Sequence, residues 1–516
     1  MHFQMKMIYQ LSSDFPLDRK DELSEIIAQT SSVLHKGVSE ADQESSTKIS
    51  SWDISGSSLE FQFTAGETRV APHHAILRLR KYFKTTLGER FQVGLRGFKI
   101  LEYKIVISLD FPTNTPFKLP FTQEILFNEK EATIIIDPSI PEDLLEKGAI
   151  DRIIRLVNDK IHQQRYGSKA EHHRILFSSP QKQEVSSSDP TEQMVKANWL
   201  KRAAHRNQWI ITPTLTTLTE AIKNIMVDHL YKPLGFDQMI IPKLVPWDVW
   251  KRSGHSEGIF QGGFEPYFVV APQTADPKFW EEVADHVKIT KEIPRELIAS
   301  KVRPPLGGLS FAQCPPFYWW LKGETISDTT FPIKIFDWSG PTYRYESGSA
   351  YGFERVDELH RIETLFVGFP EQVIELGAQV RDKLKFIFND ILDLEVRGSY
   401  VTPWWQAHSG EVKEEKEDAK APTVGTIDFE AYMPYRGNRK DSDWLEIQNI
   451  SVIGSKYPKA FNIKSQSGDQ LWSGCGGGSF ERFLTAFIAQ KGTDLSKWPE
   501  SFLKYVDKLP KPIKFL

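Results

Sequence analysis

The sequence predicts an α+β protein with an N-terminal α+β domain at 1–165 and a larger domain with an antiparallel sheet at 196–516. The chain has 516 residues, which is long for a single domain. Strand-like segments cluster at 330–370 and 426–465 and do not alternate regularly with helices, which favours an antiparallel sheet over a doubly wound parallel one. A polar stretch at 166–195 is predicted to be the linker.

Helix and strand signals alternate along the N-terminal domain. The β-branched runs at 99–111 and 131–137 indicate strands. Residues 73–88 carry apolar side chains at helical spacing, and Gly88 predicts the end of that helix. The segment 141–164 predicts a helical end to the domain.

The larger domain begins with an amphipathic segment at 217–234, which predicts a helix because a threonine stands at the capping position. A strand is expected at 236–246 and a second long helix at 371–392. The charged run at 411–420 indicates a solvated loop or hairpin tip. We also expect an insertion in this domain around 371–420, which the family resemblance described below implies.

The composition is typical of a globular protein without a membrane span. Apolar residues make up 40% and charged residues 26%, and the net charge of -4 argues against a protein coated in nucleic acid. There is no run of about 18 uninterrupted apolar residues, and the first residues lack the features of a signal peptide. We therefore expect a cytoplasmic protein with no membrane partner.

The chain contains two cysteines, Cys314 and Cys475. Free cysteine most often packs as a small hydrophobic residue, so two buried thiols are the simplest interpretation. A metal or redox role is the alternative, and the composition alone leaves both open.

A local basic stripe lies between Arg69 and Lys104, a segment that contains nine Lys and Arg residues and only two acidic residues. Such a stripe in an acidic protein suits a phosphate-binding face, although a solvated helix and strand surface is equally compatible with it. Two histidines, His73 and His74, lie in the same stretch. Helical spacing brings three of the basic residues near one side: Arg78, Lys81 and Lys84.

Neither GxxxxGK[ST] nor a GxGxxG that opens a βαβ unit occurs, so no P-loop or Rossmann site is indicated. The glycine-rich stretch CGGGSFERFLTAF at 475–487 leads into an apolar helix. Taken alone it indicates little more than a tight turn before a helix. It indicates a nucleotide-binding site only in combination with a second stretch.

That second stretch is GPTYRYESGSAYGFERVDELHRIE at 340–363, which places long charged side chains beside aromatic ones. On a strand, Arg344 and Glu346 would point to the same face, where they could bind a phosphate and an exocyclic amine. Arg355 follows a turn, and Arg482 follows the glycine-rich stretch. Together these residues suit a bent nucleoside triphosphate with Mg²⁺, and an ion-pair ladder on a sheet surface is the alternative.

In this order the motifs resemble those of class II aminoacyl-tRNA synthetases. The segment 344–355 resembles their motif 2, and GGGSFER at 476–482 resembles motif 3. The predicted helix and strand at 217–246, with Pro242, resemble motif 1, the dimer element. The resemblance implies a class II catalytic domain, with an antiparallel sheet flanked by helices, in a homodimer.

A finer resemblance, to the methanogen-type or type-2 seryl-tRNA synthetases, covers essentially the whole chain. It implies an N-terminal tRNA-binding domain, and no sustained heptads predict a coiled-coil arm in its place. It also implies a ligase that activates serine with ATP and transfers it from seryl-adenylate to the 3′ end of tRNA(Ser). The stretches that carry it are AQCPPFYWWLKGET, FPIKIFDWSGPTYRYESG, ERVDELHRIE, WLEIQNISVIGSKYPKAFNIK, LWSGCGGG, LEKGAIDRIIRLV and DPTEQMVKANW.

The same resemblance assigns the cysteines. In that family a zinc ion is held by cysteine, glutamate and cysteine, and the matching positions are Cys314, Glu363 and Cys475. One Zn²⁺ per subunit is therefore implied. Three protein ligands leave a tetrahedral position open for the α-amino group of serine.

Further roles carry over residue by residue. The implied ATP-binding residues, which act with Mg²⁺, are Arg344, Glu346, Arg355, Val356, Glu446 and Arg482. The implied serine-binding residues are Ala312, Arg344, Glu363, Asn449 and Trp404. Arg344 and Arg482 are the implied catalytic residues, and the implied tRNA contacts are Arg78, Lys81 and Lys84.

Three positions depart from the family pattern. Leu359 stands where motif 2 commonly has a phenylalanine, which removes a stacking contribution of about 1 kcal/mol. Ser479 stands where motif 3 has a glycine, and this matters only if the backbone needs a positive φ or very close approach to phosphate. His408 replaces a glutamine in the segment that closes over serine.

Two other functions remain compatible with these motifs. A synthetase paralogue could activate a small amino acid and load it onto a carrier protein, although a large N-terminal tRNA-binding domain would not be expected there. A non-catalytic RNA-binding protein could keep the shell of the fold. The presence of the arginines and of all three zinc ligands argues against that alternative.

Overall fold

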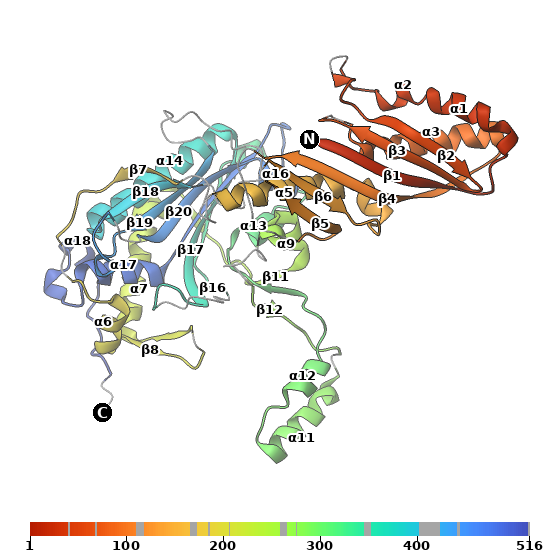
Figure 1. Ribbon diagram of the computed structural model, residues 1–516. Coiled ribbons are helices and arrows are strands. Elements are labelled where there is room, and N and C mark those ends of the chain that lie inside the picture. Colours follow the sequence, from red (N-terminus) through yellow and green to blue (C-terminus); the bar gives the residue numbers. More distant parts are fainter. Residues whose placement is uncertain are drawn as a thin grey trace. The chain divides into compact units, whose positions relative to one another are not determined.

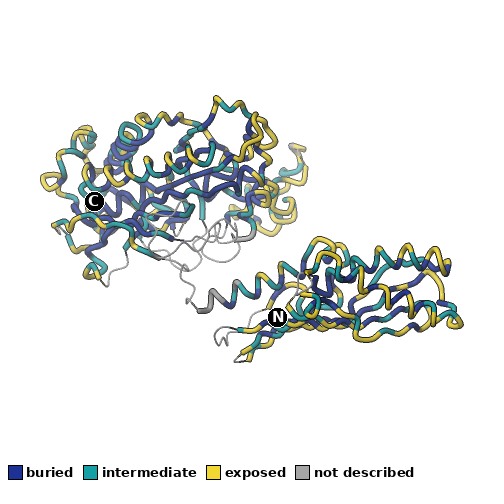
Figure 2. The backbone as a smooth tube through the Cα atoms, turned by 90° about the horizontal axis from the view of Figure 1, so that it is seen from above, coloured by how far each residue is buried: buried dark blue, intermediate teal, exposed yellow. Residues whose placement is uncertain are grey.

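A computed structural model divides the chain into two compact units, which we call the N-terminal unit, Met1–Lys169, and the C-terminal unit, Ala170–Leu516. Each unit has its own buried strands and helices (Figure 2). The structure describes residues 1–39, 42–67, 70–109, 118–128, 130–165, 173–183, 186–205, 207–258, 266–274, 276–344, 352–401, 424–440 and 444–513.

The N-terminal unit is built on an antiparallel sheet in which the strands follow the order β2-β3-β1-β4-β6-β5. The central strand β1 alternates exposed and buried residues, because successive side chains point to opposite faces of a sheet. The strands are β1 (His2–Leu11), β2 (Lys48–Ser55), β3 (Ser58–Ala65), β4 (Leu95–Ser108), β5 (Thr122–Phe127) and β6 (Glu131–Ile136).

Helices pack on the buried face of this sheet and complete one hydrophobic core. The longest described helix of the unit is α3, which buries Ile76, Leu79 and Phe83 against β1, β3 and β4. The helix runs past Gly88 and ends at Phe91, because Gln92 adopts the left-handed conformation that caps it, so the end expected at Gly88 was wrong. The helices are α1 (Lys20–Ala28), α2 (Ser31–Leu34), α3 (Pro72–Phe91), α4 (Glu142–Glu146) and α5 (Ala149–Arg165).

The C-terminal unit contains a large sheet, to which nine described strands belong, in the order β10-β15-β17-β22-β20-β19-β18-β7 with β16 paired to β17. Every pair except β10–β15 is antiparallel, which confirms the α+β class and the antiparallel sheet expected for the larger domain. The strands are β7 (His173–Ser178), β10 (Asp237–Gln238), β15 (Ile333–Asp337), β16 (Pro341–Tyr343), β17 (Glu358–Gly368), β18 (Val396–Val401), β19 (Gly425–Ala431), β20 (Leu445–Gly454) and β22 (Trp472–Ser479).

Three long helices cover one face of this sheet and share a hydrophobic core with it (Figure 1). They are α7 (Pro213–Met226), α14 (Pro370–Phe386) and α17 (Phe480–Lys491). A π-helical turn extends α7 to Tyr231 and another extends α14 to Ile391, so the helices expected at 217–234 and 371–392 are confirmed. Among the described residues, no helix has both the length and the apolar character that crossing a membrane requires.

The other face of the sheet carries shorter elements around a second core near β17 and β22. Two of the helices, α11 and α12, extend away from the sheet and bury no side chain (Figure 1). The remaining described α-helices of the unit, of which α6, α8 and α18 pack with the core of the three long helices instead, are α6 (Pro190–Lys196), α8 (Lys232–Leu234), α9 (Trp247–Ser253), α10 (His255–Gly258), α11 (Glu281–Thr290), α12 (Arg295–Ser300), α13 (Cys314–Trp320), α16 (Lys456–Ala460) and α18 (Glu500–Leu503). The small strands are β8 (Leu200–Arg202), β9 (Trp209–Ile211), β11 (Leu244–Pro246), β12 (Phe268–Val269), β13 (Gly307–Leu309), β14 (Thr325–Ile326) and β21 (Lys464–Ser465).

Two expectations from the sequence differ from this architecture. The segment 236–246 is not one strand, because its ends pair with different partners: β10 with β15, and β11 with β13. The polar stretch 166–195 includes β7, which pairs with β18 at the edge of the large sheet. The charged run at 411–420 lies outside the described residues.

The glycine-rich stretch is a strand, β22, rather than a tight turn. Neighbouring strands approach it so closely that side chains would not fit. A Cβ on Gly476 would lie 2.4 Å from the backbone oxygen of Asn449, and one on Gly478 would lie 2.1 Å from Oε1 of Gln448. The glycines therefore allow β17 and β20 to pack closely on either side of β22.

The tight packing of β22 predicts that Gly476→Ala destabilises the C-terminal unit by about 1–3 kcal/mol, because the added methyl group overpacks the sheet. Urea unfolding followed by tryptophan fluorescence measures this, since Trp52 is the only tryptophan of the N-terminal unit. Gly340→Ala is the control, because its methyl group would meet the Lys243 side chain at 3.6 Å, an ordinary contact. Equal unfolding midpoints for the two variants would contradict the packing account.

Candidate active site

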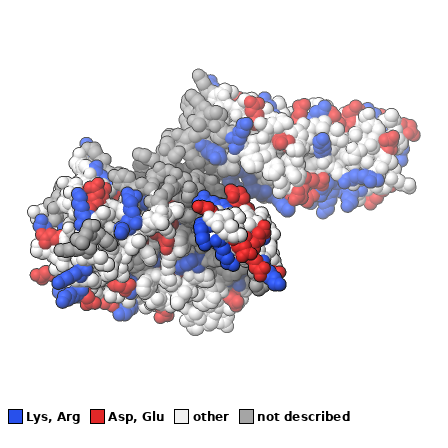
Figure 3. Space-filling model, turned by 90° about the horizontal axis from the view of Figure 1, so that it is seen from below, with Lys and Arg blue, Asp and Glu red and all other residues white. Residues whose placement is uncertain are grey.

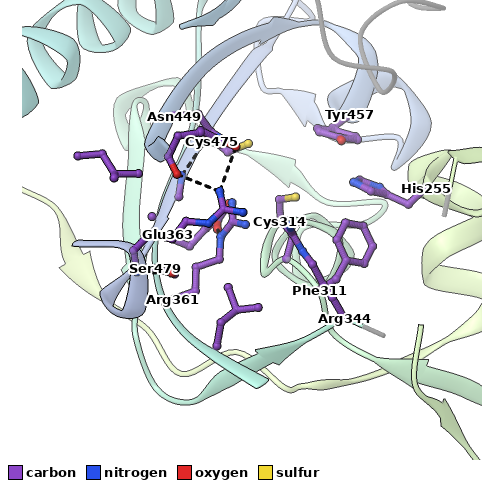
Figure 4. Close-up of a pocket in the computed structure, with 17 residues that line it drawn as sticks. His255, Phe311, Cys314, Arg344, Arg361, Glu363, Asn449, Tyr457, Cys475 and Ser479 are labelled. Carbon is purple, nitrogen blue, oxygen red and sulfur yellow. Dashed lines mark hydrogen bonds and ion pairs between the residues drawn. The ribbon is translucent and has the colours of Figure 1, made fainter. Parts of the chain in front are cut away.

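A pocket opens on the face of the large sheet that carries the shorter helices, and it gathers charged, thiol and aromatic side chains (Figure 4). Its floor consists of β17, β22 and β20, neighbouring strands in which alternate residues point to the same side. Arg344 reaches it from the end of β16, and Arg482 from the first turn of α17. The lining residues are His255, Phe311, Ala312, Cys314, Arg344, Leu359, Arg361, Glu363, Glu446, Ile447, Asn449, Tyr457, Cys475, Gly477, Gly478, Ser479 and Arg482.

Cys314, Glu363 and Cys475 form a cluster in this pocket, and their ligand atoms lie within 4.8 Å of one another. All three are less than a tenth exposed. The hydrogen bond with Cys475 and then burial raise the pKa of the Cys314 thiol. Burial raises the pKa of Glu363. Two thiols and a carboxylate buried together would therefore be stabilised as anions by a bound cation, and this donor set suits zinc.

Arg361 lies beside this cluster and was missed by the sequence analysis. Its Nε donates a hydrogen bond to Oε2 of Glu363 at 2.5 Å, and the guanidinium lies over Gly477, where a Cβ would come within 2.2 Å of it. The period of two along a strand could have revealed it, because Leu359, Arg361 and Glu363 must share one face. The ion pair holds the Glu363 carboxylate in place at the cluster.

A second set of charges lies around Glu446. Burial alone would raise the pKa of this carboxyl, but the positive charges of Arg482, Arg344 and Arg361 outweigh burial and lower it. Arg482 donates from Nη1 to Oε2 of Glu446 at 3.2 Å. A further carboxyl, Asp428, has a raised pKa because of burial and then the charge of Glu446. The pocket thus has arginines for anionic groups and one carboxylate, Glu446, whose charge acts on Asp428, and a divalent cation would stabilise both carboxylates.

Asn449 is held with its amide in a defined orientation. Its Oδ1 accepts a hydrogen bond from the backbone N–H of Gly477 at 3.1 Å. The carbonyl side of the amide is therefore committed to β22, while Nδ2 lies 3.4 Å from Oε1 of Glu446. The amide NH₂ has donor capacity left for a hydroxyl group in the pocket.

The start of α17 is fixed by two side chains. Ser479 has a φ of -105°, and its Oγ accepts a hydrogen bond from the backbone N–H of Arg482 at 3.2 Å. Because the backbone does not need a positive φ, serine replaces the usual glycine without strain and caps the helix. Glu481, which is buried, accepts from the backbone N–H of His360 at 2.9 Å and contacts its Nδ1 at 2.8 Å. These contacts hold the start of α17 against β17.

An aromatic wall on the other side of the pocket was also absent from the sequence analysis. His255 is buried in a stacked arrangement with Tyr457, and it packs against Phe311. Burial and then the charge of Lys456 lower the pKa of His255 to about 3, so the imidazole is neutral. This wall gives the pocket an uncharged side opposite Arg361 and Glu363 (Figure 4).

The structure therefore brings together eight of the residues that the resemblance assigned: Ala312, Cys314, Arg344, Glu363, Glu446, Asn449, Cys475 and Arg482. Leu359 also lines the pocket. Arg355 and Val356 line a small adjoining cavity with Arg344 and Arg482. The assigned residues Glu346 and Trp404, with His408, lie outside the described residues.

The predicted phosphate-binding helix of the N-terminal unit is α3. Lys81 and Lys84 are exposed, and Arg78 donates from Nη1 to the backbone oxygen of Lys36 at 2.7 Å. Arg80 instead pairs with Glu142 and Glu146 of α4. On the face of the molecule that Figure 3 shows, both basic and acidic side chains are scattered over the surface. Arg69 lies outside the described residues.

Comparisons with known proteins match both units. A family model described as a tRNA-binding domain matches residues 1–159. The chain is 43% identical over 517 residues to the type-2 serine–tRNA ligase of Methanococcoides burtonii and 40% identical over 521 residues to that of Methanothrix thermoacetophila, covering 100% of each chain. A crystal structure of M. kandleri SerRS in complex with A. aeolicus tRNASec aligns with a TM-score of 0.77 at 27% identity, over 100% of this chain and 99% of that one. The similarity therefore extends over the full length.

The contact between His360 and Glu481 predicts a pH-dependent stability. The hydrogen bond that His360 donates to Glu481 raises the pKa of His360, so protonated His360 stabilises the folded protein below its unfolded pKa of about 6.5. This stabilisation is lost as the pH rises through the raised folded-state pKa. We expect Glu481→Gln to lower the urea midpoint more at pH 6 than at pH 9. The same loss at both pH values would contradict a charged pair.

Proposed function

This chain belongs to the family of type-2 serine–tRNA ligases, and we propose that it joins serine to the 3′ end of tRNA(Ser) at the pocket described above. The family resemblance inferred from the motifs is confirmed, and with it the expectation of a ligase with a class II synthetase fold. One observation carries the proposed site: the thiol–carboxylate cluster, the arginines and the oriented Asn449 lie in one pocket.

In the first proposed step, a carboxylate oxygen of serine attacks the α-phosphorus of ATP in line, and pyrophosphate leaves. No side chain acts as nucleophile, so the chain contributes position and charge. Arg344 holds the α-phosphate, while Arg355 and Arg482 hold the distal phosphates. The adenine binds beside Val356, and Glu346 accepts a hydrogen bond from its amino group. Arg344 and Arg482 stabilise the charge that develops on the phosphate oxygens.

Two metal ions are proposed for this step. Glu446, with Asp428 beside it, would hold the Mg²⁺ that accompanies ATP. Cys314, Glu363 and Cys475 would hold one Zn²⁺ per subunit. Two buried thiols and one buried carboxylate are a ligand set that fits this ion. When bound, zinc supplies a Lewis acid with a coordination position for the neutral α-amino group of serine.

Serine recognition is assigned to residues around the cluster. The NH₂ group of Asn449 would donate to the serine hydroxyl, since its Oδ1 already accepts from Gly477. Ala312 would limit the size of the amino-acid side chain that the pocket accepts. Trp404 would belong to the segment that closes over serine. The carboxylate of serine would lie near Arg344, which keeps it in line with the α-phosphate.

In the second step, the terminal ribose hydroxyl of tRNA(Ser) attacks the carbonyl carbon of seryl-adenylate, and AMP leaves. The N-terminal unit would bind the tRNA through Arg78, Lys81 and Lys84 on α3. A homodimer is proposed from the motif 1 segment, where Ile240 is 77% exposed and Leu244 is 52% exposed. As an enzyme of translation the protein would act in the cytoplasm.

The proposal is tested by serine-dependent exchange of pyrophosphate into ATP, followed by charging of purified tRNA(Ser). A site that hydrogen-bonds a hydroxyl group discriminates against an analogue that lacks it by roughly 10⁴, so serine should exceed alanine by that order in kcat/KM. Asn449→Ala should remove most of this preference. Alanine activated as well as serine would favour an amino-acid:carrier-protein ligase, and no exchange would favour a non-catalytic RNA-binding protein.

Cys475→Ser is expected to lower the zinc content by one ion per chain and to abolish serine activation, because a hydroxyl replaces a thiolate ligand. Metal analysis and pyrophosphate exchange on the same preparations measure both. Ser473→Ala, two residues earlier on β22, should keep both properties. A Cys475→Ser enzyme that retains full activity without this metal would end the zinc proposal.

Replacing Arg78 and Lys81 with alanine should weaken tRNA binding. The slope of log K for tRNA binding against the logarithm of the salt concentration should become shallower by about 2, one for each lost phosphate contact. Pyrophosphate exchange should stay unchanged, since adenylate formation needs no tRNA. Arg80→Ala is the matched control on the same helix, because Arg80 already pairs with Glu142 and Glu146. If the double variant charges tRNA normally across salt concentrations, α3 is only a solvated surface.

A further inference from the structure

We propose that the N-terminal unit holds a divalent transition-metal ion of its own, bound by His73, His74 and Asp151. The two histidines open α3, and Asp151 lies in the first turn of α5. Their ligand atoms lie within 4.8 Å of one another, as in the cysteine–glutamate–cysteine cluster of the other unit. Nothing in the proposed ligase reaction uses this cluster.

The carboxylate of Asp151 lies between the two imidazole rings. Nε2 of His73 is 3.0 Å from Oδ1, and Nε2 of His74 is 2.9 Å from Oδ2. Two ligand atoms on one zinc ion, each about 2.0–2.2 Å from it, would be roughly 3.3–3.5 Å apart in a tetrahedral site. The three side chains therefore need only small shifts to share an ion.

His73 is oriented as a metal ligand would be. It is 3% exposed, and its Nδ1 lies 2.7 Å from the hydroxyl of Tyr103. A hydrogen bond at the other ring nitrogen fixes the orientation of a ligating imidazole. Burial lowers the pKa of His73, which keeps the ring neutral and its nitrogen lone pair available.

The ligand set selects the class of ion. Two imidazoles and a carboxylate suit Zn²⁺, Co²⁺, Ni²⁺ or Fe²⁺, whereas Mg²⁺ and Ca²⁺ prefer oxygen ligands alone. The side chains of His74 and Asp151 are 38% and 43% exposed, so solvent can enter and supply the remaining ligands. We take Zn²⁺ as the occupant, with cobalt as its spectroscopic substitute.

A hydrogen-bonded clamp without metal is the alternative for the same three residues. In the clamp each Nε2 carries a proton that it donates to Asp151. The Nδ1 atom of His74, buried and without a hydrogen-bond partner in the described part of the chain, would be a bare acceptor in the clamp and an unpaired N–H donor in the metal site, so it favours neither. The clamp and the metal site differ in one measurable quantity, the number of ions bound.

The ion would fasten the start of α3 to α5. Arg78 and Lys81 lie one to two turns further along α3, so a fixed helix start would hold them in position for tRNA phosphates. This consequence rests on the proposed tRNA-binding role of α3, whereas the metal site itself does not.

The test is the metal content of the untagged full-length protein after dialysis against zinc, measured by mass spectrometry. We expect two ions per chain for the wild type and one for Asp151→Asn or His74→Ala. Asp143→Asn is the matched control, because this exposed carboxylate pairs only with Lys147 among the residues described around it, and it should leave two. The same count for wild type and Asp151→Asn would overturn the site and leave the clamp.

A cobalt titration of the wild-type protein tests the same site without any variant that could fail to fold. In the wild type, the cysteine cluster should give a thiolate-to-cobalt charge-transfer band, and a further equivalent should add visible d–d absorption without any additional charge-transfer intensity. Absence of that sulfur-free equivalent would also overturn the site. Because Cys475→Ser should remove only the signals of the cysteine cluster and leave the sulfur-free d–d absorption, failure of the zinc proposal in the ligase pocket is distinguishable from failure here.

Discussion

The pocket depends on how closely β17 and β22 pair. The glycine run of β22 leaves room for Arg361 to lie across the strand and bind Glu363. If any larger residue stood at Gly477, the guanidinium would lose its place, and Glu363 would be a buried carboxylate without its arginine. Breaking such a buried pair typically costs 3–5 kcal/mol, so the glycines are required for the charge arrangement as much as for the sheet.

The charges around this pairing are arranged for substrates that are themselves charged. Arg482, Arg344 and Arg361 together lower the pKa of Glu446, so this half-buried carboxylate stays ionised. A triphosphate with a divalent cation would add negative and positive charge where the arginines and the carboxylates already lie. Preorganised charges of this kind need little rearrangement during phosphoryl chemistry, which is how the site would lower the barrier without a nucleophilic side chain.

Local patterns in the sequence predicted the helices and the antiparallel sheet, and the family resemblance indicated eight of the residues that line the pocket. The features that the sequence did not predict depend on contacts between residues that are distant along the chain. Gly88 reads as a helix stop, but packing on the sheet extends α3 to Phe91. Arg361 owes its position to Gly477 on another strand. His73 and Asp151 are 78 residues apart, so no local pattern could join them.

The central claim is that Cys314, Glu363 and Cys475 hold a zinc ion that receives the amino group of serine. Anomalous diffraction at the zinc edge, from crystals grown with serine, tests it most directly. The account predicts a peak between the two Sγ atoms and the Glu363 carboxylate, with the amino nitrogen of serine bound to it. Serine bound with its amino group away from such a peak, or no peak between these side chains, would contradict it.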